Sequence, residues 1–203
     1  FLRWDQKAKD VLTGWQDGGK PSGEVVTVEI DEKSLSQFGR WPWSRDRLSA
    51  LLQGIQDAGA DTIVLDMVFP EPDLGQPAPH LAPGTSAARS ADLPPRWTTT
   101  NDDVLAARLR NGRVVIGFHF KFASVQAAPS RCTLHPLPLV IVESGSTSEP
   151  AFFTASGVSC NADELFRAAA GSGFVNATSD SDGVLRRVPL VAEYDKGMYP
   201  SLA

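Results

Sequence analysis

The segment SRDRLSALLQGIQDAGADTIVLD, residues 44–66, decides the fold class of this chain. Its first part has leucine and isoleucine residues spaced three, four and seven positions apart, which predicts an amphipathic helix that Ser44 caps and Gly59 ends. Its second part, residues 62–66, is apolar almost throughout, as is typical of a strand that is covered on both faces. A helix followed at once by a buried strand indicates an α/β fold.

Elements of the same kind are predicted on both sides of this segment. Upstream, residues 24–31 are rich in β-branched side chains and predict a strand that ends at Asp31. This strand, the helix and the strand at 62–66 would form a right-handed βαβ unit. Downstream, residues 100–103 have the spacing of a capping box and predict a helix ahead of a strand at 114–118.

The C-terminal third predicts a change to antiparallel strands. Asn161 is expected to cap a short helix, and residues 173–176 predict a buried strand. The pair Asp182-Gly183, followed by the apolar residues 184–191, favours a hairpin turn. The expected fold is therefore a mixed α/β sheet with a parallel βαβ core, antiparallel C-terminal strands and helices on both faces.

Two irregular insertions interrupt one predicted domain. Residues 1–20 have apolar positions on one helical face and predict an amphipathic entry helix, and residues 21–203 predict a single domain. Proline, glycine and serine crowd the insertions at about 70–100 and 123–160, although residues 139–142 have the composition of a strand.

The composition excludes two classes of partner contact for the chain as given. The formal net charge is -5 and the basic residues are scattered singly, so no positive surface for nucleic acid is expected. No run reaches the roughly 18 apolar residues that a membrane span needs. The chain starts without Met and stops in mid-pattern, and we expect it to be part of a longer protein.

Catalytic motifs are absent from the sequence. It has no nucleophile elbow, no phosphate-binding loop, no HExxH pair and no dinucleotide fingerprint. His80, His119 and His135 do not have the spacing of metal ligands. We therefore predict a non-catalytic domain without a metal site or a cofactor.

Two acids are candidates for binding a ligand. Asp31 and Asp66 end the two strands of the predicted βαβ unit, where open α/β sheets place their ligand crevice. Carboxylates there suit a metal, a base or a cationic ligand. The alternative is that each acid caps the turn or helix that follows it.

The segment GRWPWSR, residues 39–45, supplies the other candidates: Trp41, Trp43 and Arg45. Tryptophan and arginine dominate binding hot spots when they are exposed. Folded inward, the same tryptophans would plug the top of the core, and Arg45 would pair with Asp31 or Asp66.

Two further features have structural interpretations. Asp180, Asp182 and Gly183 lie in a segment that begins like a calcium loop, but Pro189 occupies the position of the required bidentate glutamate, so we predict a structural turn. The only cysteines, Cys132 and Cys160, fit either a disulfide or two unrelated buried thiols.

Two ordered blocks of the chain closely resemble the type-two CHASE family, whose name denotes a sensory extracellular domain associated with cyclases and histidine kinases. The first block covers about 50 residues and the second about 30. The matching segments are DEKSL (31–35), GRWPWSR (39–45), GADTIVLD (59–66), FPEPD (69–73), GFVN (173–176), DSDG (180–183), RRVPL (186–190) and YPSLA (199–203).

The resemblance implies a periplasmic domain of a bacterial inner-membrane receptor with flanking transmembrane helices. Such a receptor passes a signal to a cytosolic nucleotide cyclase or to a kinase, including those of two-component systems. An exported domain favours the Cys132–Cys160 disulfide. The family does not supply a ligand, so the five candidate residues keep no assigned chemical role.

Three functions compete at this point. The first is a signal-input domain that binds an unknown small ligand or protein signal. The second is a protein-interaction domain that acts without a small ligand, for example as a homodimer. The third is a metal-dependent hydrolase that uses Asp31 and Asp66 with Asp73 or Asp180, although it lacks histidine ligands and a recognisable nucleophile.

Overall fold

The computed structural model describes residues 23–75, 99–122, 132–138, 153–177, 179–180 and 182–202. The chain divides into two compact units, residues 1–42 and 43–203. The predicted entry helix at 1–20, the candidate strand at 139–142 and most of both predicted insertions lie outside the described residues.

The first unit contains one described helix, α2 (Glu32–Phe38). Residues 24–30 ahead of it form neither helix nor strand, so the strand predicted at 24–31 is wrong. Val25, Val26 and Val28 expose 87%, 79% and 56% of their surface, so among the described residues no strand covers this β-branched segment. The sequence did not predict α2, whose seven residues carry only a short helical pattern.

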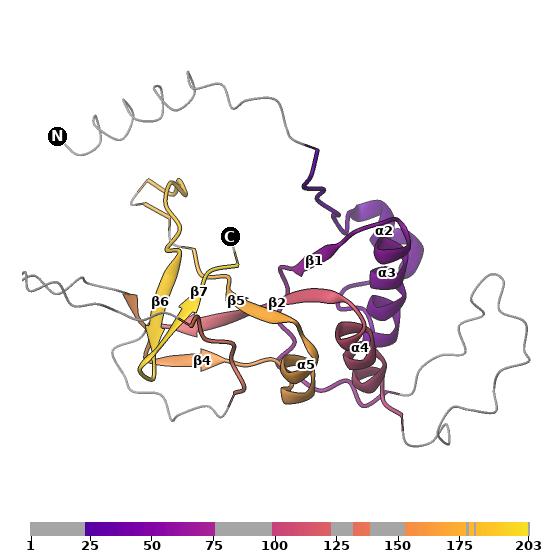
Figure 1. Cartoon of the computed structure of the whole chain (residues 1–203). Helices are drawn as coiled ribbons and strands as arrows, with labels where there is room; N and C mark the ends of the chain where they lie inside the picture. The colour runs from indigo at the N-terminus through magenta and orange to yellow at the C-terminus, as the bar shows by residue number, and fades with distance from the viewer. Residues whose placement is uncertain are drawn as a thin grey trace, which may run out of the picture. The chain divides into compact units, whose positions relative to one another are not determined.

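The main sheet of the second unit is parallel at its centre (Figure 1). The strand β2 (Arg113–Lys121) lies between β1 (Thr62–Leu65) and β5 (Gly171–Phe174), and it pairs with both in parallel. The crossover from β1 to β2 contains α4 (Asn101–Arg110), and the crossover from β2 to β5 contains α5 (Asp163–Ala168). The βαβ units are therefore one step further along the chain than predicted.

Three helices pack beside this sheet. The helix α4 contacts both α5 and α3 (Arg45–Asp57), so the three helices form one row. The predicted capping box of α4 is confirmed, since Thr100 and Asp103 exchange hydrogen bonds. The largest fully buried apolar side chains are Phe69, Phe118, Phe166, Phe174, Leu52, Leu105, Leu109, Ile116, Leu165, Val114 and Val158.

One prediction for β1 fails because only one of its faces is covered. Ile63 is buried and lies opposite Val114, but Val64 exposes 53% of its surface.

On β5, a side chain at Gly173 would place its Cβ 2.8 Å from the Cα of Leu202. The C-terminal segment therefore passes so close to β5 that this position requires glycine.

The C-terminal antiparallel pairing is confirmed, but at a different turn. The strands β6 (Val191–Tyr194) and β7 (Gly197–Pro200) form a hairpin with β3 (Phe153–Thr154) beside β6. Its turn is Asp195–Lys196, with φ values of 46° and 65°, and residues 184–189 after Asp182-Gly183 form no strand. A further strand, β4 (Gly157–Ser159), pairs antiparallel with the end of β2 inside the region predicted as irregular.

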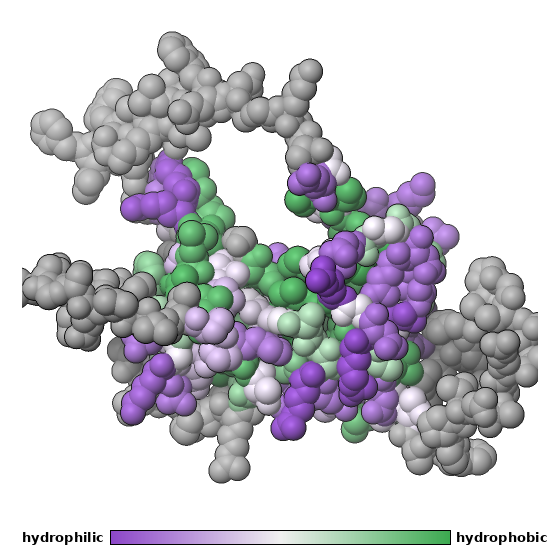
Figure 2. All heavy atoms as spheres, in the orientation of Figure 1, coloured by the Kyte–Doolittle hydropathy of each residue, from purple (hydrophilic) through white to green (hydrophobic). Residues whose placement is uncertain are grey.

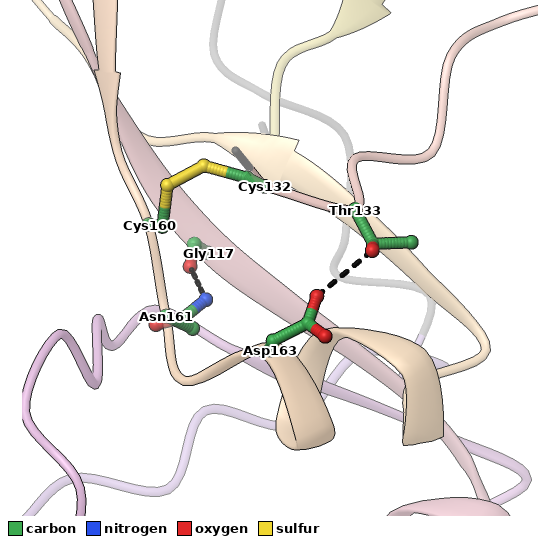
Figure 3. Close-up of a disulfide and its surroundings, with 6 residues drawn as sticks. All are labelled: Gly117, Cys132, Thr133, Cys160, Asn161 and Asp163. Atoms are coloured by element: carbon green, nitrogen blue, oxygen red, sulfur yellow. Dashed lines mark hydrogen bonds between the residues drawn. A yellow bond between two sulfur atoms is a disulfide. The ribbon is translucent and has the colours of Figure 1, made fainter. Parts of the chain in front are cut away.

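The predicted disulfide between Cys132 and Cys160 is confirmed (Figure 3). Next to it, the Asn161 side chain accepts a hydrogen bond from the Phe69 N–H and donates one to the Gly117 carbonyl at 2.8 Å. The prediction that Asn161 caps α5 is therefore wrong, and Ala162 occupies the N-cap. Asn161 thereby satisfies two buried backbone groups, one in the segment after β1 and one in the middle of β2.

The predicted fold class, a mixed α/β sheet with parallel and antiparallel strands, is confirmed. No helix in the described part of the chain is both long and apolar enough to cross a membrane.

Candidate functional site

The topology gathers the first turns of three helices at one end of the main sheet. Each of α3, α4 and α5 precedes a parallel strand, β1, β2 and β5 respectively. A helix that leads directly into a strand runs antiparallel to it, so its N-terminus lies near the carboxyl ends of the strands. Open α/β sheets bind their ligands at this end.

Arg45, the first residue of α3, is the buried centre of this region. Its side chain Nε lies 3.4 Å from Asp102 Oδ1, and its Nη2 donates to the Glu71 carbonyl at 3.2 Å. Its guanidinium carbon stands 4.4 Å from the centre of the Phe69 ring. The acid that pairs with Arg45 is therefore Asp102, which was not among the predicted partners.

Asp73 binds the backbone of one helix and the side chain of another. Its Oδ2 accepts the Arg45 N–H at 3.0 Å, and the Asn101 amide donates to both of its oxygens at 3.1 Å. Burial alone would raise the pKa of Asp73, but hydrogen bonds from Arg45, Asn101 and Gly75 hold that pKa below its ordinary value. Asp73 is therefore the firmly ionised acid of the group.

Asp102 and Glu164 form the second pair of acids. Asp102 has no exposed surface, and its Oδ2 accepts the Asp73 N–H at 2.7 Å. Burial raises the pKa of Asp102. Burial, followed by the negative charge of Asp102, raises the pKa of Glu164.

We call Arg45, Asp73, Asn101, Asp102 and Glu164 the polar cluster. Several of its buried atoms lack a hydrogen-bond partner in the described part of the chain: Arg45 Nε, Asn101 Oδ1 and Asp102 Oδ1. Buried polar atoms are normally hydrogen-bonded, so exceptions of this kind are typical of sites with a functional role. Two of these atoms, Arg45 Nε and Asp102 Oδ1, are joined by the 3.4 Å ion pair, which leaves Asn101 Oδ1 as the unpartnered atom of this set.

The predicted candidates do not all belong to this cluster. Asp31 caps α2 by accepting the Ser34 N–H at 2.8 Å, which lowers its pKa. Asp66 follows β1 and is exposed. Trp43 is 7% exposed, with the Arg47 guanidinium 6.0 Å from its ring centre, and Trp41 is 42% exposed in the other unit.

The turn at Asp180, Asp182 and Gly183 is held by its own ion pairs. Gly183 has a φ of +82°, and its N–H donates to the Asp180 carbonyl at 2.9 Å. Arg186 binds Asp180 at 2.9 Å and Asp182 at 2.8 Å. The hydrogen bonds from Arg186 hold the pKa of Asp182 well below its ordinary value.

Sequence reasoning overlooked Asp102 and Glu164 because both were interpreted as residues of helix starts. A signal for Asp102 was present. Asp102 shares the buried face of α4 with Leu105, Ala106 and Leu109, at spacings of three, four and seven residues. An acid on the apolar face of an amphipathic helix needs a buried partner.

A shallow hollow lies at the opposite end of the sheet, with a volume of about 340 Å³. It is lined by Gln56 near the end of α3, by Asn111 and Gly112 after α4, and by the exposed ion pair of Asp61 with Arg113. Exposed pairs of this kind contribute little to affinity. Among the described residues, no group of three His, Cys, Asp or Glu side chains is placed to hold a metal ion.

Comparison with known proteins gives one match. The sequence model described as CHASE2 domain matches residues 1–203, which is the whole chain. Neither a curated protein nor a solved structure matches it.

Proposed function

The chain belongs to the CHASE2 family of extracellular, non-catalytic sensory domains, and we propose that it is the signal-input domain of a bacterial transmembrane receptor. In this proposal the domain lies in the periplasm between transmembrane helices and regulates a cytosolic cyclase or kinase. The Cys132–Cys160 disulfide supports the location, since such bonds persist in oxidising compartments.

The polar cluster is the observation that carries this proposal. It joins α3 and α4 through an ion pair and hydrogen bonds at the carboxyl ends of the parallel strands, and the charge of Asp102 raises the pKa of Glu164 in the first turn of α5. A signal that changes the charge balance there favours one arrangement of the three helices over another. A sensory domain requires such a differential interaction with two states.

Ligand binding by this site is testable with a thermal-shift screen of the oxidised chain. The panel contains amino acids, carboxylates, sugars, nucleotides and metal ions, because a ligand selective for the folded state raises the melting temperature. We expect a saturable hit that Arg45→Lys weakens and that Arg113→Lys, at an exposed position, leaves intact. A hit that both variants bind equally well would place the ligand elsewhere.

Exposed apolar side chains favour protein interaction as a second candidate function. Phe153 and Phe122 are both exposed, and their ring centres lie 6.4 Å apart. Leu190 and Val184 are also exposed. Figure 2 shows hydrophobic residues along the side where β6 and β7 lie in Figure 1, and hydrophilic residues where α3 and α4 lie. Apolar groups gathered on a surface are typical of interaction sites.

Self-association through this surface is measurable by sedimentation at several chain concentrations. We expect Phe153→Ser to weaken any dimer, because it removes an exposed aromatic ring. Val64→Ser is the control, because it replaces an exposed apolar residue on a different strand. Equal dimerisation in both variants would exclude this surface.

The hydrolase alternative is not part of the proposal. It relied on Asp31 and Asp66 as metal ligands, but Asp31 accepts hydrogen bonds from both the N–H and the hydroxyl of Ser34. These bonds account for Asp31 as a helix cap.

A further inference from the structure

We propose that His135 and Ser172 form an acid-sensitive latch, which holds residues 132–138 on the sheet while His135 is neutral and releases them when His135 binds a proton. Neither residue belongs to the polar cluster. The latch itself rests on hydrogen-bond geometry, whereas its use as a signal rests on the proposed sensory function.

Residues 132–138, which we call the strap, have one covalent end. The Cys132–Cys160 disulfide joins the strap to the segment before α5 (Figure 3). Next to it, the Thr133 hydroxyl donates to Asp163 Oδ1 at 2.8 Å, at the start of α5. This end stays attached while the disulfide is intact, so any release of the strap begins further along it.

Two hydrogen-bonded contacts hold the rest of the strap. The Leu137 N–H donates to the Met198 carbonyl of β7 at 2.7 Å. Between the two ends, His135 Nδ1 lies 3.0 Å from Ser172 Oγ, and the His135 backbone N–H donates to the same oxygen at 3.4 Å. Ser172 lies on β5 and exposes only 4% of its surface. The strap thus bridges β5 of the main sheet and β7 of the C-terminal hairpin.

The hydrogen bonds of Ser172 determine which protonation state of His135 fits. Ser172 Oγ accepts the His135 N–H, and the buried hydroxyl needs an acceptor for its own proton. Among the described residues, the acceptor that this hydroxyl meets is His135 Nδ1. A neutral imidazole with its proton on Nε2 fulfils this role. A proton taken up from solvent at Nδ1 occupies the same lone pair, so the hydroxyl loses its acceptor and two donors face each other.

The charges around the latch do not compensate for a protonated His135. On α5, Asp163 pairs with Arg167 at 2.7 Å. The strap carries no other titratable side chain, β5 carries none, and β7 carries Tyr199, whose pKa is raised by burial. Burial is the cause that lowers the pKa of His135 below the ordinary histidine value. The latch is therefore closed near neutral pH and opens in acid.

Opening of the latch acts on both strands that hold the C-terminal segment. The strand β5 ends at Phe174, whose carbonyl accepts the Leu202 N–H at 2.9 Å and which forms a bridge with Ser201. The strand β7, which ends directly before Ser201, holds the strap through Met198. A change at the strap therefore reaches residues 201–202 from two sides.

The test is hydrogen exchange of the Leu137 amide in the oxidised 203-residue chain at pH 4.5 and pH 7.5, corrected for the intrinsic pH dependence of exchange. Acid should accelerate exchange at least about fivefold, the order of effect of one lost hydrogen bond. In His135→Asn this acceleration should vanish, because the asparagine Oδ1 accepts a hydrogen bond but binds no proton in this range. The matched control His119→Asn, at an exposed position of β2, should keep it.

Ser172→Ala removes the latch from its other side, so the Leu137 amide should exchange as fast at pH 7.5 as it does in the wild type in acid. An acid response that persists in His135→Asn, or a wild type without one, would overturn the latch. A two-bond ¹H–¹⁵N spectrum at pH 7.5 that places the His135 proton on Nδ1 would do the same. Should His135→Asn not fold, Ser172→Ala and this spectrum decide. None of these results touches the proposed sensory function, which the ligand screen tests independently.

Discussion

Two clusters of arginine and aspartate in this protein use the same residue types in opposite ways. In the polar cluster, Arg45 and Asp102 are buried, and their 3.4 Å ion pair joins two atoms that have no hydrogen-bond partner among the described residues. In the turn, Arg186 binds Asp180 and Asp182 directly, and the side chains of these three residues are 15–25% exposed. The pKa of Asp102 is raised by burial, whereas hydrogen bonds from Arg186 lower the pKa of Asp182.

The difference shows what makes a charged cluster responsive. Hydrogen bonds that match every charge fix the turn in one state, so a change in its surroundings has little to act on. In the polar cluster, burial without complete hydrogen bonding means that each proton or contact that is gained or lost changes the free energy by a larger amount. The four predictions below test this contrast, starting with the largest expected effect.

Arg45→Ala should lower the free energy of unfolding by about 3–5 kcal/mol, because it leaves Asp102 buried without its cation. Arg186→Ala should cost less, about 1 kcal/mol, since its acids reach solvent. Urea unfolding of both variants near neutral pH measures the two values. Equal losses would break the distinction between the clusters.

Replacing both cysteines, Cys132→Ser with Cys160→Ser, should lower the free energy of unfolding by about 3 kcal/mol, since the bond closes a loop with a sequence separation of 28 residues. Cys160 lies three residues before α5, so the loss should also loosen the side of the polar cluster that carries Glu164. Hydrogen exchange of the α5 amides, compared with those of the turn, measures this local effect. Equal protection in both forms would show that packing alone holds α5.

Glu164→Gln should stabilise the fold at neutral pH and flatten its pH dependence. A raised folded pKa means that the folded state holds more protons than the unfolded chain, so stability is highest below the ordinary glutamate pKa and falls as pH rises through the folded value. Glutamine removes this loss and keeps a donor towards Asp102. Urea midpoints from pH 4 to pH 8 for Glu164→Gln and Glu71→Gln test it, and parallel curves for both variants and the wild type would contradict it.

Asp182→Asn should have the smallest effect, with the opposite sign of pH dependence. Its folded pKa is depressed, so its contribution is present above the ordinary aspartate pKa and is lost as pH falls towards the folded value. The variant should therefore differ from the wild type near neutral pH and converge with it in acid. Thermal unfolding at pH 7 and pH 3 checks this, and a difference that grows in acid would refute it.

Local patterns in the sequence were sufficient for several elements. The apolar spacing that leads to Ile55 predicted α3, and the capping box at Thr100 predicted α4, because a helix satisfies its hydrogen bonds within one segment. The strand at 24–31 failed for the converse reason. A strand depends on a neighbour, and its composition does not show whether one is present.

The candidate site divides in the same way. The sequence placed Arg45 beside the carboxyl ends of the strands, because the order of helices and strands fixes where that end lies. It did not connect Arg45 with Asp102, which is 57 positions away and looked like part of a helix start. A capping pattern describes the first backbone turn only, and it says nothing about which other element covers the helix.

The sequence by itself determined the α/β class, the family and the positions of two helices, since these depend on local periodicity and ordered motifs. Only the tertiary structure decided that Asp102 is buried, that its charge raises the pKa of Glu164 and that Arg45 pairs with it. The physical reason is that a charge acquires its energetic weight from burial and from partners distant in sequence. A responsive site of this kind therefore becomes visible once the helices that carry it are packed together.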